Sequence, residues 1–342
     1  MSNQAWQITA PGTLTLNNID TVPDPGAKEV VVRIHAVALN YRDKLVIDHN
    51  PAYPVKHKAN LVPTCDGAGI VEDSGQSSRW KKGDRVVVNP NTWIHGADGR
   101  DFELDKALGG GENDGTLRKW MTVSDESLLR APENLSMEEA STIFTAGVTA
   151  YRSLFYGGVK LQPGVTVLTQ GTGGVSCYAI MVAAAAGATV VATSSSDEKL
   201  QVARKLGATH LVNYRTTTDW AAKVLEVTGG HGADLVVDVV GAQSIEQTLK
   251  CTAFAGVVCV VGMLSEDPAM PVNVMAELLF GGKTLRGQLG AGSRQMAEEL
   301  SAFMARHDLH PPVAEVFDFE KAPEALEALT KLSAPGKIVL RC

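Results

Sequence analysis

Residues 165–199 read VTVLTQGTGGVSCYAIMVAAAAGATVVATSSSDEK. The apolar run Val165–Thr169 is typical of a buried strand, and the glycines after it predict a turn that opens an Ala-rich helix. A second apolar strand, Thr189–Thr193, ends in three serines. Glycines let a backbone approach a pyrophosphate, and the start of the helix presents free N–H groups to it. A glycine turn without a ligand is the alternative. We predict a phosphorylated dinucleotide at Gly171, Thr172, Gly173, Gly174, Val175 and Ser176.

Strand-like and helix-like segments alternate from about residue 165 to 288. Short Val-rich runs joined by helices predict a parallel, doubly wound sheet covered on both faces, as in a Rossmann domain. Helices are expected to begin near Gly174, Asp197, Thr218, Ala242 and Val272. The predicted strands are Val165–Thr169, Thr189–Thr193, His210–Asn213, Asp234–Val240, Val257–Gly262 and Thr284–Gln288.

The two ends of the chain predict a second domain. Before residue 130, strand-like runs are separated by Pro, Gly, Asn and Asp turns, which is typical of an antiparallel, barrel-like β domain. After residue 290, helices at about 293–306 and 322–332 precede a closing strand, Lys337–Arg341, which needs a sheet to join. We expect the N-terminal β domain to be its host. The predicted division is 1–129 with 288–342 for the β domain, and 130–287 for the Rossmann domain. The early strands are Glu29–Leu39, Gly67–Glu72, Asp84–Asn89 and Lys119–Val123.

The bulk composition excludes several classes of protein. A chain of 342 residues is long enough for two cores. Its net charge of −7 argues against a nucleic-acid-binding surface. The longest apolar run, Cys177–Val191, is interrupted by Gly187, so we expect no membrane span. The N-terminal residues lack the pattern of a secretion signal, and five cysteines without close pairing indicate a reducing, cytoplasmic setting.

Several motifs occur in an order that resembles a known family. They are ALNYRD (38–43), CDGAGIVEDSG (65–75), KKGDRVV (81–87), AGVTAY (146–151), GTGGVS (171–176), VNYR (212–215), VVDVVG (236–241) and GKIVL (336–340). Together they resemble the medium-chain dehydrogenase/reductase superfamily, in its zinc-free quinone-oxidoreductase-like and zinc-type alcohol dehydrogenase-like branch. The resemblance covers the whole chain. It implies a GroES-like β domain, a Rossmann domain, NADP(H) or NAD(H), and a homodimer.

The positions at which zinc-containing relatives hold their metal differ here. By the resemblance, Asn40 stands at the first zinc-ligand position of those relatives, and Cys65-Asp66 stands at their next pair of ligand positions. Residues 141–148, where the later ligand is expected, contain no ligand candidate. Catalytic zinc needs about three protein ligands. We expect the adjacent side chains of Cys65 and Asp66 to point in different directions. The loop at 91–116 has no cysteine, and its acidic and histidine residues predict a solvated loop rather than a metal site: His95, Asp98, Asp101 and Glu103. We therefore predict no metal.

Without a metal, hydrogen bonds must polarise the substrate. Hydride addition to an enone or a quinone places negative charge on a carbonyl oxygen, and donors aimed at that oxygen lower the barrier. Tyr41 is the candidate proton donor, or else an aromatic that packs a turn. Asn40 either orients a carbonyl or caps the helical turn that follows it. Arg42 and Asp43 are expected to pair, and Asp66 to make structural hydrogen bonds. Trp93 and Phe144 line the pocket or belong to the core.

The end of the second Rossmann strand bears on the choice of cofactor. An NAD site would place an acid there, about twenty residues beyond the glycines, whereas this strand ends in Ser194 and Ser195. Small hydroxyls leave room for a 2′-phosphate, Lys199 adds positive charge, and Tyr214 with Arg215 closes the other side. We therefore predict NADPH. Helix capping by Ser194–Ser196 is an alternative role, and if the strand extends to Asp197, NAD becomes the cofactor.

Further cofactor contacts follow from the rule that ligands bind at the carboxyl ends of parallel strands. Val240-Gly241 and Gly262-Met263-Leu264 end the fourth and fifth strands. Thr149 resembles the family's threonine beside the nicotinamide, and residues 290–294 follow the sixth strand. The pocket walls are expected from loops at about 45–60, 91–115 and 263–295.

The function predicted from these features is an NADPH-dependent reductase of activated C=C bonds (enones, enoyl groups) or of quinones. It acts by hydride transfer to a small molecule and without zinc. A zinc-independent alcohol or carbonyl dehydrogenase is one alternative. A protein that binds NADPH with little turnover is another.

Overall fold

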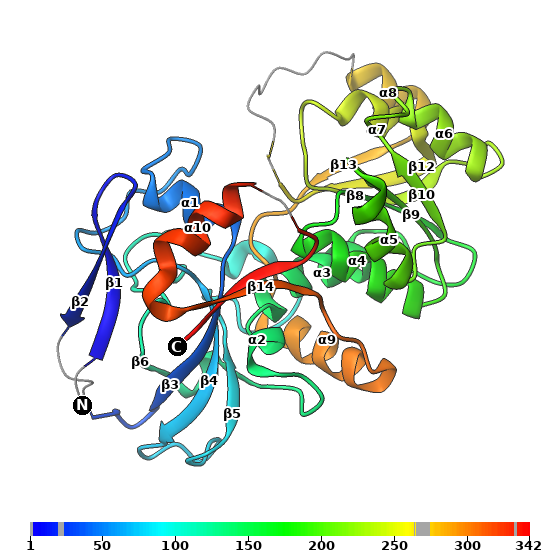
Figure 1. Ribbon diagram of the computed structural model, residues 1–342. Coiled ribbons are helices and arrows are strands. Elements are labelled where there is room, and N and C mark those ends of the chain that lie inside the picture. The colour runs from blue at the N-terminus through cyan, green and yellow to red at the C-terminus, as the bar shows by residue number, and fades with distance from the viewer. Residues whose placement is uncertain (1–2, 20–23, 263, 265–273, 332–333) are drawn as a thin grey trace. The chain divides into compact units, whose positions relative to one another are not determined.

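The computed structural model describes residues 3–19, 24–262, 264, 274–331 and 334–342, and the chain divides into two compact units (Figure 1). The β unit comprises Met1–Val148, Gly292–Ser333 and Lys337–Cys342, and the Rossmann unit comprises Thr149–Ala291 and Ala334–Gly336.

The boundaries therefore differ from those that we expected at 129 and 287. Helix α2 (Met137–Ala140) and the π-helical turn Ile143–Val148 pack against strands of the β unit, so the first boundary lies later. Gln288 donates to the carbonyl of Thr149 at 2.9 Å, which holds the segment after the last strand within the Rossmann unit.

The β unit contains a hairpin and a larger mixed sheet. The hairpin pairs β1 (Asn3–Ala10) with β2 (Thr13–Ile19). The sheet has the order β14 (Val313–Asp318), β15 (Lys337–Arg341), β3 (Glu29–Ala38), β4 (Asp66–Asp73), β5 (Arg85–Val88), β7 (Leu128–Arg130), with β6 (Trp120–Ser124) also paired to β3. The helices are α1 (Tyr41–Ile47), α2, α9 (Arg294–His307) and α10 (Ala322–Lys331), and short 3-10 turns lie at Gly99–Asp101, Asp125–Ser127 and Phe319–Lys321.

The expectation that the closing strand joins the N-terminal β domain is confirmed. Strand β15 pairs antiparallel with the end of β3, with Leu340 opposite Val37. This pairing places the start of β15 close to the residues that follow β3. Residues from opposite ends of the sequence therefore meet at one edge of the unit.

The Rossmann unit has the predicted fold class. Its six strands are all parallel in the order β10-β9-β8-β11-β12-β13, and the order reverses between β8 and β11, where such sheets bind ligands. The strands are β8 (Thr166–Gln170), β9 (Thr189–Ser194), β10 (His210–Asn213), β11 (Ala233–Asp238), β12 (Thr252–Val260) and β13 (Thr284–Gly287). The helices are α3 (Thr149–Tyr156), α4 (Gly174–Ala185), α5 (Asp197–Lys205), α6 (Trp220–Val227), α7 (Ile245–Cys251) and α8 (Val274–Gly281).

The largest difference from the predicted strands concerns β12, which begins at Thr252 rather than Val257. Its pairing with β11 is irregular near Ala255, where the backbone has a φ of +60°. Strands β1, β2, β7 and β14 were not predicted. Strand β2 is largely exposed or half-buried, so it lacks the apolar run that marks a buried strand.

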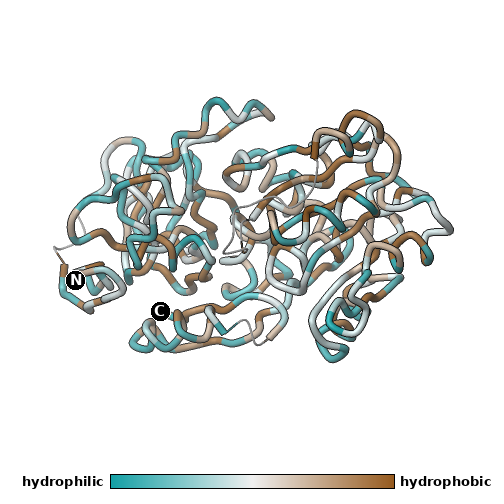
Figure 2. The backbone as a smooth tube through the Cα atoms, turned by 90° about the horizontal axis from the view of Figure 1, so that it is seen from above, coloured by the Kyte–Doolittle hydropathy of each residue, from teal (hydrophilic) through white to brown (hydrophobic). Residues whose placement is uncertain are grey.

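Hydrophobic stretches run through the interior of each unit, and hydrophilic residues are common in the outer turns (Figure 2). Helix α4 is buried along most of its length, which explains why its sequence is apolar rather than amphipathic. Across the described ranges, no helix has both the length and the apolar character needed to cross a membrane.

Candidate functional site

The glycine turn lies between β8 and α4, as predicted. Gly171 has a φ of +72°, a conformation that favours glycine, and a methyl group added at Gly171 or Gly173 would meet no atom within 4 Å. Ser176 donates to the carbonyl of Gln170 at 2.7 Å, which fixes the turn from inside. The first N–H groups of α4 have no partner within the helix, as at any helix start. The turn thus offers donors, a favourable dipole and open space, which fits a pyrophosphate.

The three serines at the end of β9 and just after it have different roles. Ser194 is buried, and its Oγ lies 3.4 Å from Oγ1 of Thr172 in the glycine turn. Ser196 caps α5 by accepting from the N–H of Lys199, while Ser195 is half-buried. The capping role that we considered for these serines thus falls to Ser196.

Strand β9 ends at Ser194 and does not extend to Asp197. Asp197 is the first residue of α5, and its carboxylate accepts from the side chain of Asn213 at 2.9 Å. The condition under which we expected NAD is therefore not met. Tyr214 follows β10, donates its N–H to the carbonyl of Ser194 at 3.1 Å and is 42% exposed.

Asp238, at the end of β11, is a buried centre of hydrogen bonds that sequence reasoning missed. It accepts from the N–H groups of Val240 (3.0 Å) and Gly241 (2.8 Å) and from the side chains of Gln170 and Thr248 (both 3.3 Å). Burial raises the pKa of Asp238, and these hydrogen bonds oppose that shift. Because the N–H groups of Val240 and Gly241 are engaged by Asp238, only carbonyls and side chains remain for a ligand there.

The other predicted cofactor contacts also lie in the Rossmann unit. Gly262 follows β12, and a Cβ there would lie 2.6 Å from the carbonyl oxygen of Val239, so the position requires glycine. Leu264 is 36% exposed, and Met263 lies outside the described residues. Thr149 begins α3, is buried, and accepts at its carbonyl from Gln288.

In the β unit, Asn40 joins two segments through its carboxamide. Its Nδ2 donates to Asp66 at 3.0 Å and to the carbonyl of Ala38 at 3.3 Å, and its Oδ1 accepts from Nζ of Lys337. Its backbone N–H donates to the carboxylate of Asp43 at 2.9 Å. Asn40 is the N-cap residue of α1, but both of its amide hydrogens already have acceptors within the protein. The geometry therefore favours a positioning role over a substrate contact.

Asp66 and Lys337 form the charged centre of this cluster, and they are 1% and 6% exposed. Asp66 accepts from Thr145 through its hydroxyl (2.8 Å) and its N–H (3.2 Å), in addition to Asn40. Lys337 also donates to the carbonyl of Leu39. Burial raises the pKa of Asp66 and lowers that of Lys337, and each charge opposes the shift of the other. These are the structural hydrogen bonds that we expected of Asp66.

Sequence reasoning missed Thr145 and Lys337. Thr145 lies on the π-helical turn, a local irregularity that is frequent at functional sites. Lys337 is the first residue of β15 and precedes three apolar residues. A buried lysine at the start of an apolar run is the signal that could have revealed it.

The expectation that Cys65 and Asp66 point in different directions is wrong. The thiol of Cys65 lies 3.9 Å from Asp66 and 3.4 Å from the hydroxyl of Thr145. Cys65 precedes β4, after Thr64 with a φ of +68°, so the alternation of strand side chains does not apply to it. Burial raises the pKa of the Cys65 thiol to about 12, and the group is therefore protonated at neutral pH.

The residues present do not fit a zinc ion. Within the described ranges, no group of three or more His, Cys, Asp or Glu is arranged to hold a metal. At the position of the family's ligands, the carboxamide of Asn40 is already engaged, and the ammonium of Lys337 would repel a cation. In the loop at 91–116, Asp98 pairs with Arg100, and Glu103 pairs with Lys106 at 2.6 Å.

Tyr41 begins α1 and is 41% exposed, so its ring does not pack inside a turn. The two residues that follow it, Arg42 and Asp43, have structural roles. Arg42 pairs with Asp43 at 3.2 Å, as expected, and donates to the hydroxyl of Tyr53 at 2.8 Å. Within the part of the chain that the structure describes, the Tyr41 hydroxyl has no hydrogen-bond partner, which leaves it available to a ligand.

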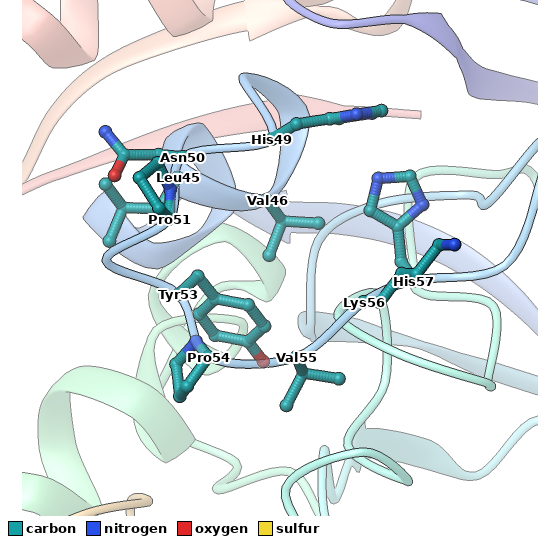
Figure 3. A pocket seen from close by; sticks show the side chains of 10 residues that line it. All are labelled: Leu45, Val46, His49, Asn50, Pro51, Tyr53, Pro54, Val55, Lys56 and His57. Carbon is teal, nitrogen blue, oxygen red and sulfur yellow. The ribbon is translucent and has the colours of Figure 1, made fainter.

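Two of the three loops expected to form pocket walls, 45–60 and 91–115, line two separate pockets of the β unit, and the described residues of the third, 263–295, line neither of them. One pocket, of about 310 Å³, lies beside α1 and is formed by residues 45–57 (Figure 3). Figure 3 shows Val46 and the rings of Tyr53 and His57 around its middle. The other is lined by residues of the loop at 91–115 and by residues that precede and follow it in the sequence. Trp93 and Phe144 are fully buried and belong to the core rather than to a pocket wall.

Comparison with known proteins finds a matching family for each of the two units. Residues 26–133 match the family described as alcohol dehydrogenase GroES-like domain, and residues 174–306 match zinc-binding dehydrogenase. The chain is 39% identical to a zinc-type alcohol dehydrogenase-like protein of Schizosaccharomyces pombe (93% of this chain, 91% of the relative). It is 26% identical to the quinone oxidoreductase of Homo sapiens (98% and 96%). A crystal structure of an NAD-dependent alcohol dehydrogenase is 31% identical, with a TM-score of 0.88 (99% of both chains).

Substitution of Lys337 tests the charged cluster. The Lys337→Met variant leaves Asp66 buried without its cation, so we expect the free energy of unfolding to fall by about 3–5 kcal/mol. The double variant Lys337→Met/Asp66→Asn removes both charges and should lose less. Urea unfolding monitored by circular dichroism measures both. The exposed control Lys106→Met should change stability by less than about 0.5 kcal/mol. Equal stability of Lys337→Met and the unmodified protein would contradict the assignment.

Proposed function

Because this chain belongs to the medium-chain dehydrogenase/reductase superfamily and is an NAD(P)H-dependent oxidoreductase, we propose that it reduces activated C=C bonds or quinones with NADPH and without zinc. The observation that carries the proposal is the cluster of Asn40, Asp66, Thr145 and Lys337. The ammonium group of Lys337 and the carboxamide of Asn40, which already has partners in the protein, lie where a metal site would need free ligands. The likeness to the human quinone oxidoreductase adds support.

The residues that would hold the cofactor fit NADPH. Gly171, Gly173 and the first turn of α4 would bind the pyrophosphate. Ser194, Ser195, Lys199 and Tyr214 would surround the 2′-phosphate. When bound, the reduced nicotinamide supplies the hydride. Val240, Gly241, Gly262, Met263, Leu264 and Thr149 complete the proposed set of contacts.

The proposed chemistry uses residues of α1 and the segment before it. As the substrate accepts a hydride, its carbonyl oxygen gains negative charge, and the hydroxyl of Tyr41 donates a hydrogen bond to that oxygen and then a proton. Asn40, Asp43 and Arg42 hold the start of α1 in place, because each has its own partners in the protein. Pre-organised donors of this kind need little rearrangement during the reaction.

A second candidate is an alcohol or carbonyl dehydrogenase that acts without zinc. The names of the S. pombe relative and of the NAD-dependent alcohol dehydrogenase favour the alcohol chemistry and say nothing in favour of the absence of zinc. A third is a protein that binds NADPH with little turnover. The three candidates differ in which acceptors, if any, oxidise NADPH, and one assay separates them.

We also propose a homodimer. Four large apolar side chains of the Rossmann unit, on β12 and α8, are 73–81% exposed: Phe254, Met275, Leu279 and Phe280. Strand β13 ends the strand order beside them. Exposed apolar side chains that gather in this way mark interaction surfaces. Sedimentation equilibrium measures the mass of the particle, and the mass of a single chain would rule the dimer out.

The proposed reaction predicts which acceptors oxidise NADPH. Steady-state loss of NADPH absorbance is expected with enones and quinones and not with saturated ketones, and alcohols with NADP are expected to give no rise in NADPH absorbance. Turnover of alcohols alone would favour the second candidate. If NADPH binds by fluorescence and no acceptor in the panel oxidises it, the third candidate holds instead.

The choice of cofactor depends on Lys199. We expect Lys199→Ala to weaken NADPH binding about tenfold, because a charged hydrogen bond to the 2′-phosphate is lost, and to leave NADH binding unchanged. Titration of nucleotide fluorescence measures both constants. Lys205→Ala, at the far end of the same helix, is the matched control. An equal loss for NADPH and NADH in Lys199→Ala would contradict the assignment.

The role of Tyr41 is tested by Tyr41→Phe, which removes one oxygen atom from an exposed side chain. We expect kcat with an enone to fall about 10²-fold or more, with NADPH affinity unchanged. Stopped-flow absorbance under single-turnover conditions separates the chemical step from product release. Tyr156→Phe, a tyrosine on α3, controls for loss of a hydroxyl elsewhere. Unchanged single-turnover rates in Tyr41→Phe would remove this residue from the mechanism.

A further inference from the structure

Two buried side chains, Gln288 and Arg152, tie the segment that follows β13 to the first turn of α3. Gln288 is 7% exposed, and its Nε2 donates to the carbonyl of Thr149 at 2.9 Å. Its Oε1 lies 3.3 Å from the hydroxyl oxygen of Ser153, and its backbone N–H donates to the carbonyl of Val260 at 2.9 Å. The carboxamide of Gln288 therefore has a partner at each end, which fixes its orientation.

Arg152 makes the second connection, to the backbone of the residues that follow Gln288. Its Nη1 donates to the carbonyls of Leu289 at 2.9 Å and Gly290 at 3.4 Å. Burial and the nearby charge of Arg286 lower the pKa of Arg152, but a guanidinium remains protonated even so. Hydrogen bonds from a charged donor are stronger than those between neutral groups. Helix α3 thus holds the three consecutive residues 288–290.

These contacts lie at the end of the sheet where a nucleotide would bind. Ligands of such sheets bind beyond the carboxyl ends of the strands, and a dinucleotide crosses the point where the strand order reverses, here between β8 and β11. Ser194 and Tyr214, the proposed contacts of the 2′-phosphate, lie at the ends of β9 and β10. The nicotinamide half therefore falls on the side of β12 and β13, and Gln288 directly follows β13.

Thr149 and Leu289 are the residues of this region that have groups left for a ligand. The carbonyl of Thr149 accepts from Gln288 and, at 2.8 Å, from the hydroxyl of Ser153. Within the described ranges, the hydroxyl of Thr149 has no hydrogen-bond partner. Leu289 is 64% exposed although its carbonyl is held by Arg152. A polar group and an apolar surface on a fixed backbone suit a ring that carries a carboxamide.

We propose that Gln288 and Arg152 are positioning residues for the nicotinamide half of the cofactor. They hold Thr149 and residues 288–290 in one arrangement before the cofactor binds, and the nicotinamide then meets the hydroxyl of Thr149 and the side chain of Leu289. Because these groups are already in place, little binding free energy is lost in ordering them. This role rests on the proposed function, since it requires a nicotinamide nucleotide, but it does not depend on which acceptor is reduced.

The test compares NADPH with 2′,5′-ADP, which carries the 2′-phosphate but no nicotinamide, by isothermal titration calorimetry on the full chain. In Gln288→Leu, we expect the dissociation constant of NADPH to rise about tenfold and that of 2′,5′-ADP to change by less than about twofold. Arg152→Met should show the same selective loss. Thr252→Val is the matched control, because it removes a buried hydrogen bond to the carbonyl of Thr248 at the opposite end of β12, and it should leave both constants unchanged.

An equal loss of both ligands in Gln288→Leu would overturn the proposal, because it would show a structural role for the whole unit. Unchanged NADPH binding in Gln288→Leu and Arg152→Met would also overturn it. If neither variant folds, Ser153→Ala decides, because it removes only the hydroxyl that bonds to Thr149, and we expect a selective loss of about threefold for NADPH.

The same experiment separates this role from the proposed reaction. Binding needs no acceptor, so a protein that binds NADPH and reduces neither enones nor quinones contradicts the proposed function alone. If NADH binds in place of NADPH, the comparison is made between NADH and ADP, with the same selective loss expected. Failure of the unmodified protein to bind either reduced nucleotide would overturn both proposals.

Discussion

The interaction on which the β unit depends most is the buried bond between the ammonium of Lys337 and the carboxamide of Asn40, residues 297 positions apart in the sequence. It ties the start of the last strand to the end of β3. A buried cation of this kind is stable only with a nearby anion, and Asp66 supplies that charge. Asp66 in turn orders Thr145 on the π-helical turn. Two buried charges that both contact Asn40 thus link four segments around the residue that precedes Tyr41.

In the Rossmann unit, too, a buried carboxylate holds the surrounding backbone in place. Asp238 holds the turn after β11 through backbone N–H groups, and Ser176 holds the glycine turn through the carbonyl of Gln170. In both units, polar side chains close to the proposed ligands are already engaged by the protein. What remains for a ligand is a small set of groups, namely the first N–H groups of α4, the hydroxyl of Tyr41 and the residues around Ser195. Side chains that already have partners within their own unit need little rearrangement when a ligand binds, and electrostatic catalysis depends on such pre-organisation.

Much of the Rossmann unit could be predicted from the sequence because its strands are short, continuous apolar runs with glycines at their ends. The glycine turn and the end of β9 are local features and needed no knowledge of packing. The cluster in the β unit was only partly predictable. Asn40 and Asp66 stood out by their motifs, but Lys337 and Thr145 join them through long-range pairing of β15 with β3 and through a π-helical turn that no periodicity marks. The wrong expectation for Cys65 has a local origin. It rested on the two residues being adjacent, whereas the Cys65 thiol, after Thr64 with a φ of +68°, lies near Asp66 and Thr145.

We propose that an ammonium group, and not a metal ion, organises the part of the β unit around Tyr41. The most direct test of this proposal measures zinc by plasma mass spectrometry and turnover of an enone in the same samples, before and after dialysis against a chelator. The account predicts that turnover stays constant while zinc remains far below one ion per chain. Turnover that falls with the zinc content, and returns when zinc is added back, would contradict it.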